Sequence, residues 1–461
     1  PFPWPNNDWF KTVITNLAFL PQFFKQNPDL KAPLLKLLES KRLTVVGCGV
    51  SEPDQLTVYY DDLLANYEMG RQFCRDELGI DSRIGWDIDS FGASATVARL
   101  FSEMGYEHVF LTRITMAAKD KLLSDSNDYV FNWKHPMYSD LDIMTSVYPT
   151  HYGLNGNRDR NLARTNSDIL NPSREGFKDK VQTMTHLFQI EPFLLGDFRS
   201  NNALFMFGDD FFYEDPKDRF YGIPLIVMFL NSNSNGAFSG NKIKISSLND
   251  YLESVRKEGL TYKDSYAPDF LQYSKLEKDS ESIWTGFYTS RSYIKQEIRE
   301  FGLLYRGITQ YAAYLALTGQ QSFQKIREVL KLDQEAGWVS AFLTHHDAIT
   351  GTCTRTVVKE NARMMRMGAD GLSIFLANIT SNSTTPLDSD LLIGSSFSPM
   401  NFSQPNRFVV INQDIEGEKA VKILLPTRYL NGIKIVCDTT GRTVQMDQTL
   451  LACDSTSSCT L

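Results

Sequence analysis

The chain has 461 residues, enough for roughly two to four domains. Hydrophobic residues make up 42% and charged residues 22%, as in ordinary globular domains, and no apolar run approaches the roughly 18 to 20 residues that span a bilayer. The 47 basic and 55 acidic residues give a net charge of −8 without a lysine and arginine cluster, so we expect no membrane span and no nucleic-acid partner.

The first half of the chain alternates between strand-like and helix-like runs. The opening PFPWPNNDWFKT is rich in proline and asparagine, which suits an extended entry segment anchored by Trp4 and Trp9. Strand-like runs follow at residues 43–47, 83–89 and 108–114, with helix-like stretches between them. This rhythm predicts parallel β/α units, whose functional residues stand at the carboxyl ends of the strands.

The second half begins with helical periodicity. Apolar residues recur at steps of three and four from Arg291, and Gly319 is placed to end that helix. Further helices are predicted at residues 322–332, around Trp338 and Phe342, and at residues 357–367, together forming a helical bundle. A Ser/Thr/Pro-rich linker after Gly371 leads to β-like runs at residues 407–412 and 419–426, which predict the start of a β domain.

Cysteines and glycosylation sequons indicate the compartment. None of the six cysteines forms a CxxC pair, which argues against a zinc ribbon or a thioredoxin-type site. Three N-x-S/T sequons, at Asn378, Asn382 and Asn401, crowd into the Ser/Thr-rich stretch, where glycans would be accessible. We therefore expect a protein of the secretory pathway whose signal segment has been removed ahead of Pro1.

Acidic residues stand where two strands are predicted to end. GWDIDSFGAS places Asp87 and Asp89 at the first of these ends, and Arg113 follows the next strand, where it can hold a carboxylate ionised or bind a polar substrate. A helix cap for one aspartate and a structural ion pair for Arg113 are the alternatives. FGDDFFYEDP places Asp209 and Asp210 after the apolar run ALFM, with a solvated loop as the alternative. Paired carboxylates from two strands are the minimum for glycoside hydrolysis and also for a divalent metal site.

LTHHDAITGTCT brings two of the six histidines beside an acid. Adjacent histidines on a helix diverge by about 100 degrees, so at most one is expected to face a given site. A neutral imidazole of one of these histidines could bind zinc, with Asp347 orienting it.

Together these segments resemble glycoside hydrolase family 38, the class II or lysosomal-type α-mannosidases. GWDIDSFGAS is similar to the family motif WxIDPFGHS, FGDDFFYE to G-[SD]-D-F, WTGFYTSR to WxGYYxSR, and HHDAITGT to HHDAxxGT. The resemblance covers nearly the whole chain and implies an α/β fold. It assigns residues 1–290 to a seven-stranded parallel β/α catalytic domain, residues 291–375 to a three-helix bundle with the HHD motif, and residues 376–461 to the sequon-bearing linker and a partial β-sandwich, the start of an all-β domain.

The same motifs imply roles in a retaining hydrolysis of mannose-containing glycans with zinc as cofactor. Asp89 corresponds to the nucleophile and a zinc ligand, Asp210 to the general acid/base, Arg113 to a neighbour of Asp89, and His346 to another zinc ligand. The aromatic residues implied to contact substrate are Trp9, Tyr152 and Trp284.

The zinc-binding motif is degenerate. The family opens with HxHxDxGW, and its second histidine and its aspartate correspond to Trp4 and Asn6 when the segments are aligned on Trp9. Tryptophan cannot bind zinc, and an asparagine carbonyl is a weak, neutral substitute for a carboxylate. Further departures fall at Ser90, Ala93 and Lys275.

Two functions therefore stay open at the level of sequence. One is an α-mannosidase-like hydrolase with a weakened zinc site; the other is a catalytically inactive homologue that serves as a glycan-binding or structural glycoprotein. A lysosome-like or an extracellular location fits both. Because family members continue well beyond this length, a carboxy-terminal fragment of the same precursor is an expected partner, and an oligomer stays open.

Overall fold

The computed structural model describes residues 11–126, 128–148, 152, 198–206, 208, 210, 227, 231–232, 242–265, 269–274, 282–380, 424–426, 452–453 and 458–460. The chain divides into two units, Pro1–Ser290 and Arg291–Leu461. No helix in these described ranges has the length and apolarity needed to cross a bilayer.

A parallel pair of strands opens the first unit. β1 (Thr12–Asn16) pairs with β2 (Leu43–Gly49), and helices α1 (Leu20–Gln26) and α2 (Pro28–Glu39) connect them. Every residue of β2 is buried. Helix α3 (Tyr60–Phe73) packs against β2 and continues into a π-helical turn, η2 (Cys74–Leu78). The strand that is buried along its whole length therefore anchors this end of the unit.

The main sheet of the described residues has five strands in the order β3-β5-β7-β6-β8. β3 (Ile84–Asp87), β5 (His108–Leu111) and β7 (Tyr138–Val147) run parallel, whereas β6 (Val130–His135) is antiparallel to β7. The short β8 (Asp264–Ser265) lies parallel to β6 at the edge. The expected seven-stranded parallel sheet is not confirmed: β6 and β7 are joined by a tight turn, which permits only antiparallel pairing.

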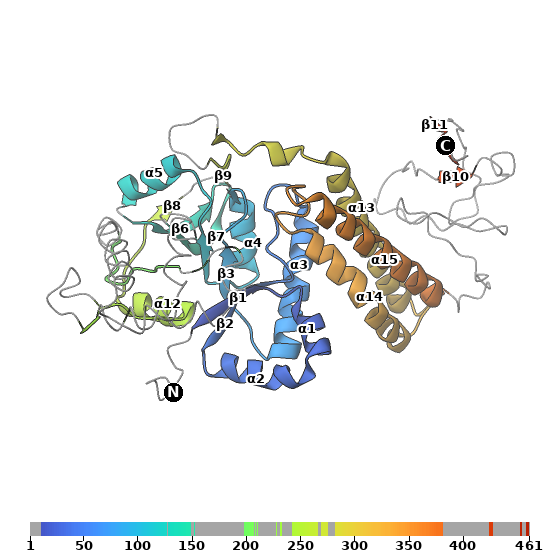
Figure 1. Ribbon diagram of the computed structural model, residues 1–461, viewed down its shortest axis with the longest axis horizontal. Helices are drawn as coiled ribbons and strands as arrows, with labels where there is room; N and C mark the ends of the chain where they lie inside the picture. Colours follow the sequence, from blue (N-terminus) through green and yellow to red (C-terminus); the bar gives the residue numbers. More distant parts are fainter. Residues whose placement is uncertain are drawn as a thin grey trace, which may run out of the picture. The chain divides into compact units, whose positions relative to one another are not determined.

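Helices cover both faces of this sheet (Figure 1). Side chains alternate along β5, so Val109 and Leu111 join a core with α4 (Ala95–Glu103), while Phe110 joins another with α12 (Leu248–Lys257). Ser94 caps α4 through its hydroxyl, and Ser247 caps α12 in the same way. Helix α5 (Met116–Ser126) follows β5, and β4 (Ala93–Ser94) pairs with β9 (Asp269–Phe270).

The second unit is built on three long helices that pack against one another (Figure 1). They are α13 (Ser292–Leu317), α14 (Phe323–Leu343) and α15 (Arg355–Thr380). The helices predicted at 322–332 and around Trp338 are one helix, because the lone Gly337 is a weak interruption that costs about 1 kcal/mol. α15 runs on to Thr380, so Asn378 lies in a helix and not in the linker. β10 (Leu424–Pro426), β11 (Ala452–Cys453) and β12 (Ser458–Thr460) form a small antiparallel sheet.

Candidate active site

An ion pair joins the ends of two neighbouring parallel strands. Asp89 lies two residues beyond β3, and Arg113 lies two residues beyond β5. Nε and a terminal nitrogen of Arg113 both contact Oδ1 of Asp89. The side chain of Asp89 is 19% exposed and that of Arg113 is 11% exposed. Solvent therefore screens this pair far less than it screens a surface ion pair.

Aromatic rings surround the Arg113 guanidinium. The distances from its Cζ to ring centroids are 5.6 Å for Phe91, 5.8 Å for Tyr152, 5.7 Å for Tyr273 and 5.1 Å for Trp284. Phe91 and Tyr273 are buried, and each packs edge-on against Trp284. Rings within about 6 Å attract a cation through their faces. Burial works to lower the pKa of Arg113, but Asp89 and Tyr273 outweigh it and the pKa is raised, so the guanidinium stays charged.

Tyr152 connects this ion pair to the second predicted carboxylate. Its hydroxyl donates a hydrogen bond to Oδ1 of Asp210 at 3.1 Å, while its ring lies over Arg113. Burial, followed by the negative charges of Asp89 and Asp210, raises the pKa of Tyr152 well above its ordinary value. The phenol is therefore a neutral donor, and the structure brings Asp89, Arg113, Tyr152, Asp210 and Trp284 into one neighbourhood.

Asp87 has a different role from Asp89. It is 3% exposed and accepts a hydrogen bond from Nε2 of Gln55, whose Oε1 accepts from the backbone N–H of Ser94 at 2.7 Å. Asp87 therefore stands at the end of β3 as expected, but it is buried and its carboxylate is held by Gln55. Neither aspartate caps the following helix, because Ser94 does so.

The segment before Asp210 departs from the predicted strand. Residues 202–206 form no strand, and Asp210 itself is exposed. Glu258 holds the start of this segment by accepting hydrogen bonds from Ser200 and Asn202, and Leu204 and Met206 pack against the apolar core on the α12 face. Side-chain hydrogen bonds and apolar contacts thus hold this segment in place of the backbone hydrogen bonds of a strand.

The HHD segment lies in the second unit, just after α14. His345 and His346 stack with ring centroids 4.1 Å apart and an interplanar angle of 28°. The expectation that adjacent histidines diverge is wrong here, because α14 ends at Leu343 and the histidines lie in a turn. Ligand atoms of His345, His346 and Asp347 lie within 4.8 Å of one another, a donor set compatible with zinc chemistry.

Two cations at the start of α13 hold this turn in place. Nζ of Lys295, which is 4% exposed, donates to the carbonyls of Ile349 and Thr350 at 3.0 and 2.7 Å. Arg291 donates to the carbonyls of Gly351 and Cys353 at 2.9 and 2.5 Å. The conformation of the HHD turn is therefore fixed by charge-assisted hydrogen bonds within its own unit.

Several predicted residues lie outside the described residues: Trp4, Asn6, Trp9, Asp209, Lys275, Asn382 and Asn401. Asn378 is described only through its backbone in α15. Phe91, Gln55 and Tyr273 were not identified from the sequence. Phe91 stands in the motif segment GWDIDSFGAS, and Tyr273 lies two residues before Lys275, a departure from the family pattern, so proximity to these positions was the available signal.

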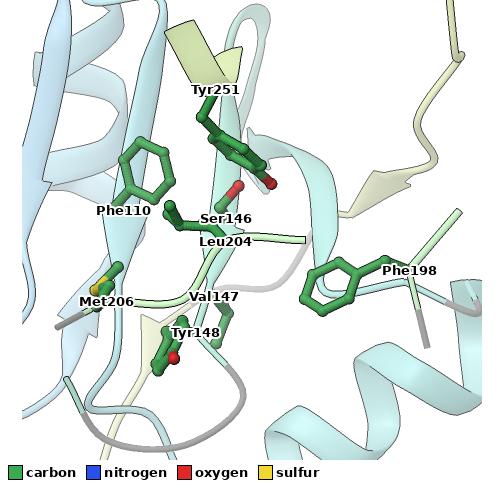
Figure 2. Close-up of a pocket in the computed structure, with 8 residues that line it drawn as sticks. All are labelled: Phe110, Ser146, Val147, Tyr148, Phe198, Leu204, Met206 and Tyr251. Atoms are coloured by element: carbon green, nitrogen blue, oxygen red, sulfur yellow. The ribbon is translucent and has the colours of Figure 1, made fainter. Parts of the chain in front are cut away.

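A pocket on the α12 side of the sheet contains none of the predicted site residues. Figure 2 shows its lining side chains, which come from β5, β7, α12 and the chain around residues 198–206. The lining is mostly apolar: Phe110, Ser146, Val147, Tyr148, Phe198, Leu204, Met206 and Tyr251. The hydroxyl of Ser146 already forms a hydrogen bond with Nε2 of His108 at 2.8 Å. We therefore interpret this space as a packing gap between the sheet and the segments that cover it, which include α12.

Comparison with protein families identifies the family of this chain. The family model for the glycosyl hydrolases family 38 N-terminal domain matches residues 7–276, and that for the alpha mannosidase middle domain matches residues 282–382. The first match covers more than half of the chain, which therefore belongs to glycoside hydrolase family 38. The resemblance read from the motifs is confirmed.

Individual relatives agree with this assignment. The chain is 27% identical to alpha-mannosidase B of Dictyostelium discoideum over 431 residues, covering 84% of this chain and 40% of that protein. It is 26% identical to the lysosomal alpha-mannosidase of Mus musculus, covering 79% and 36%. The crystal structure of an alpha-mannosidase from Enterococcus faecalis V583 superposes with a TM-score of 0.60 at 14% identity, covering 82% of this chain and 38% of the other. The chain thus spans about 40% or less of the length of these relatives.

Proposed function

We propose that this chain is the amino-terminal part of an α-mannosidase-type retaining glycoside hydrolase that acts on mannose-containing glycans. The observation that carries the proposal is a pair of carboxylates, each held by a partner: Asp89 by Arg113 and Asp210 by Tyr152. The ring of Tyr152 links the two pairs because it lies over Arg113, where other aromatic rings also gather. Sugars present apolar C–H faces and polar hydroxyls, and a site with both ring faces and carboxylates can bind both.

In the proposed reaction Asp210 protonates the glycosidic oxygen as the bond to the anomeric carbon breaks. Asp89 attacks that carbon and forms a glycosyl-enzyme. Asp210 then removes a proton from water, which attacks the same carbon and releases Asp89, so the configuration is retained. Arg113 orients Asp89 and balances its charge, while Tyr152 positions Asp210. Retention requires a carboxyl separation of about 5 to 5.5 Å.

Zinc fits the residues of this chain only in part. The family pattern assigns zinc to Asp89 and His346, and the stacked imidazoles of His345 and His346 beside Asp347 are suitable donors. Oδ1 of Asp89 is already committed to Arg113. Trp4 supplies no ligand and Asn6 only a neutral oxygen, so the expected four-ligand set is incomplete and the steps above use the carboxylates alone.

The incomplete ligand set favours a second candidate function. A protein with the aromatic wall and the carboxylates but without a working metal site would bind mannosyl glycans without cleaving them. In this case the chain serves as a glycan-binding or structural glycoprotein. Trp4 and Asn6 are the specific residues that favour this alternative.

The proposal also covers the organisation and location of the protein. It assigns residues 1–290 to a seven-stranded β/α catalytic domain, residues 291–375 to a three-helix bundle, and residues 376–461 to a linker and partial β-sandwich. Glycans at Asn378, Asn382 and Asn401, a carboxy-terminal fragment as partner, and a lysosome-like or extracellular location follow from the same proposal. Relatives that are lysosomal alpha-mannosidases support that location.

Hydrolysis of an aryl α-mannoside tests the function. The wild-type protein should release the aryl group, Asp89→Asn should lose at least about a thousandfold in kcat, and the matched exposed variant Asp61→Asn should match the wild type. Metal analysis of the same samples should give about one zinc per chain if the metal site works. Binding of a mannosyl glycan without turnover would support the second candidate. The absence of both binding and turnover would overturn the hydrolase and the glycan-binding role.

A further inference from the structure

Two cysteines from separate elements meet in the interior of the first unit. Cys48 lies in β2 and Cys74 begins the π-helical turn η2. Both residues are 0% exposed, and their Sγ atoms are 2.8 Å apart. By contrast, Cys353 is only half-buried and lies in the second unit.

The packing of α3 on β2 explains why the two sulfurs meet. A Cβ built on Gly70 would lie 2.1 Å from the carbonyl oxygen of Cys48 and 2.8 Å from the backbone nitrogen of Val50. Glycine therefore allows the helix to lie directly on the strand. Cys74 is four residues after Gly70, on the same face of the helix, so the close approach at Gly70 brings Cys74 onto Cys48.

We propose that Cys48 and Cys74 are joined by a disulfide bond in the mature protein. The two buried Sγ atoms are 2.8 Å apart, less than 1 Å from the length of about 2.05 Å that a disulfide bond has. A metal site is a poor alternative, because the described residues place no third ligand group with this pair; their one metal-compatible cluster is His345, His346 and Asp347.

Bond formation needs an oxidant from the compartment. The two thiols lose two protons and two electrons as the Sγ–Sγ bond forms, and a disulfide such as glutathione disulfide accepts them and is reduced to two thiols. The contact with Cys48, followed by burial, raises the pKa of the Cys74 thiol, so little thiolate exists once the chain has folded. The bond therefore forms during folding in an oxidising compartment.

The cross-link would stabilise the strand end that leads toward the candidate site. Cys48 is the second-to-last residue of β2, and the chain that follows carries Gln55, the partner of Asp87. The carbonyl of Pro53 in this same segment accepts a hydrogen bond from Ser90 at 2.9 Å. A link between β2 and η2 thus fixes the base of a segment that holds the GWDIDSFGAS turn. This inference does not depend on catalytic activity.

Peptide mapping of the full chain tests the proposal directly. The protein is expressed through the oxidising secretory pathway of a host cell, then denatured, alkylated without reductant and digested. The expected result is one linked peptide pair containing Cys48 and Cys74, lighter by two hydrogens than the two free peptides together, which disappears after reduction. Quantitative alkylation of both cysteines in the unreduced sample would overturn the proposal.

Thermal unfolding with and without dithiothreitol gives an independent readout. Reduction should lower the Tm of the wild type by several degrees. The double variant Cys48→Ala/Cys74→Ala should have the same Tm with and without dithiothreitol. The control variant Cys353→Ala should keep both the linked peptides and the reductant-dependent shift. Equal shifts in the wild type and the double variant would contradict the proposal, and peptide mapping of the wild type decides the matter if the double variant does not fold.

Discussion

Arg113 contacts a single carboxylate oxygen of Asp89 through two of its nitrogens, across the ends of two adjacent parallel strands. This geometry uses the planar fork of the guanidinium, which a lysine ammonium cannot reproduce. The ring faces around Arg113 add attraction that depends on the same planar shape.

Arg113→Lys should therefore damage the site although it keeps the charge. We expect kcat/KM on an aryl α-mannoside to fall about 10- to 100-fold and the free energy of unfolding to fall by about 2 kcal/mol, because the half-buried Asp89 loses its matched partner. Arg83→Lys, in an exposed pair with Glu107, is the control and should stay within about 0.5 kcal/mol of wild type. Equal effects of the two substitutions would refute this role of Arg113.

Tyr152→Phe removes the hydroxyl that donates to Asp210 and keeps the ring over Arg113. We expect kcat to fall about tenfold with little change in KM, because one hydrogen bond that positions the acid/base is lost while the aromatic wall persists. Tyr60→Phe, at an exposed tyrosine, should leave both constants unchanged. A rise in KM at constant kcat would instead assign Tyr152 to substrate binding.

His108 should make the fold sensitive to acid. Burial, with a smaller contribution from Arg256, lowers the pKa of His108 to about 3, whereas the unfolded chain has a pKa of about 6.5. Between these values unfolding takes up a proton, so stability falls as pH falls. From pH 7 to pH 5 the loss from this residue is about 2 kcal/mol.

Denaturant unfolding of His108→Gln at pH 7 and pH 5 checks this prediction. The variant should lose about 2 kcal/mol less than the wild type over that interval. An unchanged pH dependence in His108→Gln would show that another group controls it.

Gly70→Ala and Gly371→Ala should have opposite effects. An alanine Cβ at position 70 meets backbone atoms of β2, so we expect a loss of about 3 kcal/mol or more. At position 371, inside α15, nothing lies within 4 Å of the added carbon, and we expect a gain of about 0.5 to 1 kcal/mol. Thermal unfolding of the two variants measures both signs.

Lys295→Met should loosen the HHD turn. The substitution preserves the apolar stem but leaves the carbonyls of Ile349 and Thr350 without their donor, at a cost of about 2 to 3 kcal/mol. Hydrogen exchange should increase at residues 345–353, and thermal stability should fall. Lys359→Met, at an exposed lysine in α15, should change neither quantity; matching effects would mean that Lys295 acts only through its charge.

The sequence predicted the parts of the site that depend on strand ends. Asp89 and Arg113 follow two parallel strands, so their shared edge could be inferred from topology alone. Phe91, Tyr273 and Trp284 meet only after segments nearly 200 residues apart come together, which no local pattern encodes. The stacked histidines were misjudged because α14 ends at Leu343, before them. The turn that follows is held by tertiary hydrogen bonds from Arg291 and Lys295 to the carbonyls of residues 349–353, which no local pattern encodes. The antiparallel strand β6 was not predicted, because its direction is fixed by pairing with β7 and by the tight turn that joins the two strands.

Trp284 is half-buried, lies over a guanidinium and packs edge-on against two other rings. Its indole emission should therefore respond when a sugar displaces water from the exposed part of the ring. Titration with mannose, followed by tryptophan fluorescence and compared with Trp284→Phe, would read occupancy without any turnover. Trp284 thus provides an intrinsic fluorescent reporter of sugar binding at the proposed site. It can be used whether the protein is a hydrolase or a catalytically inactive sugar-binding protein.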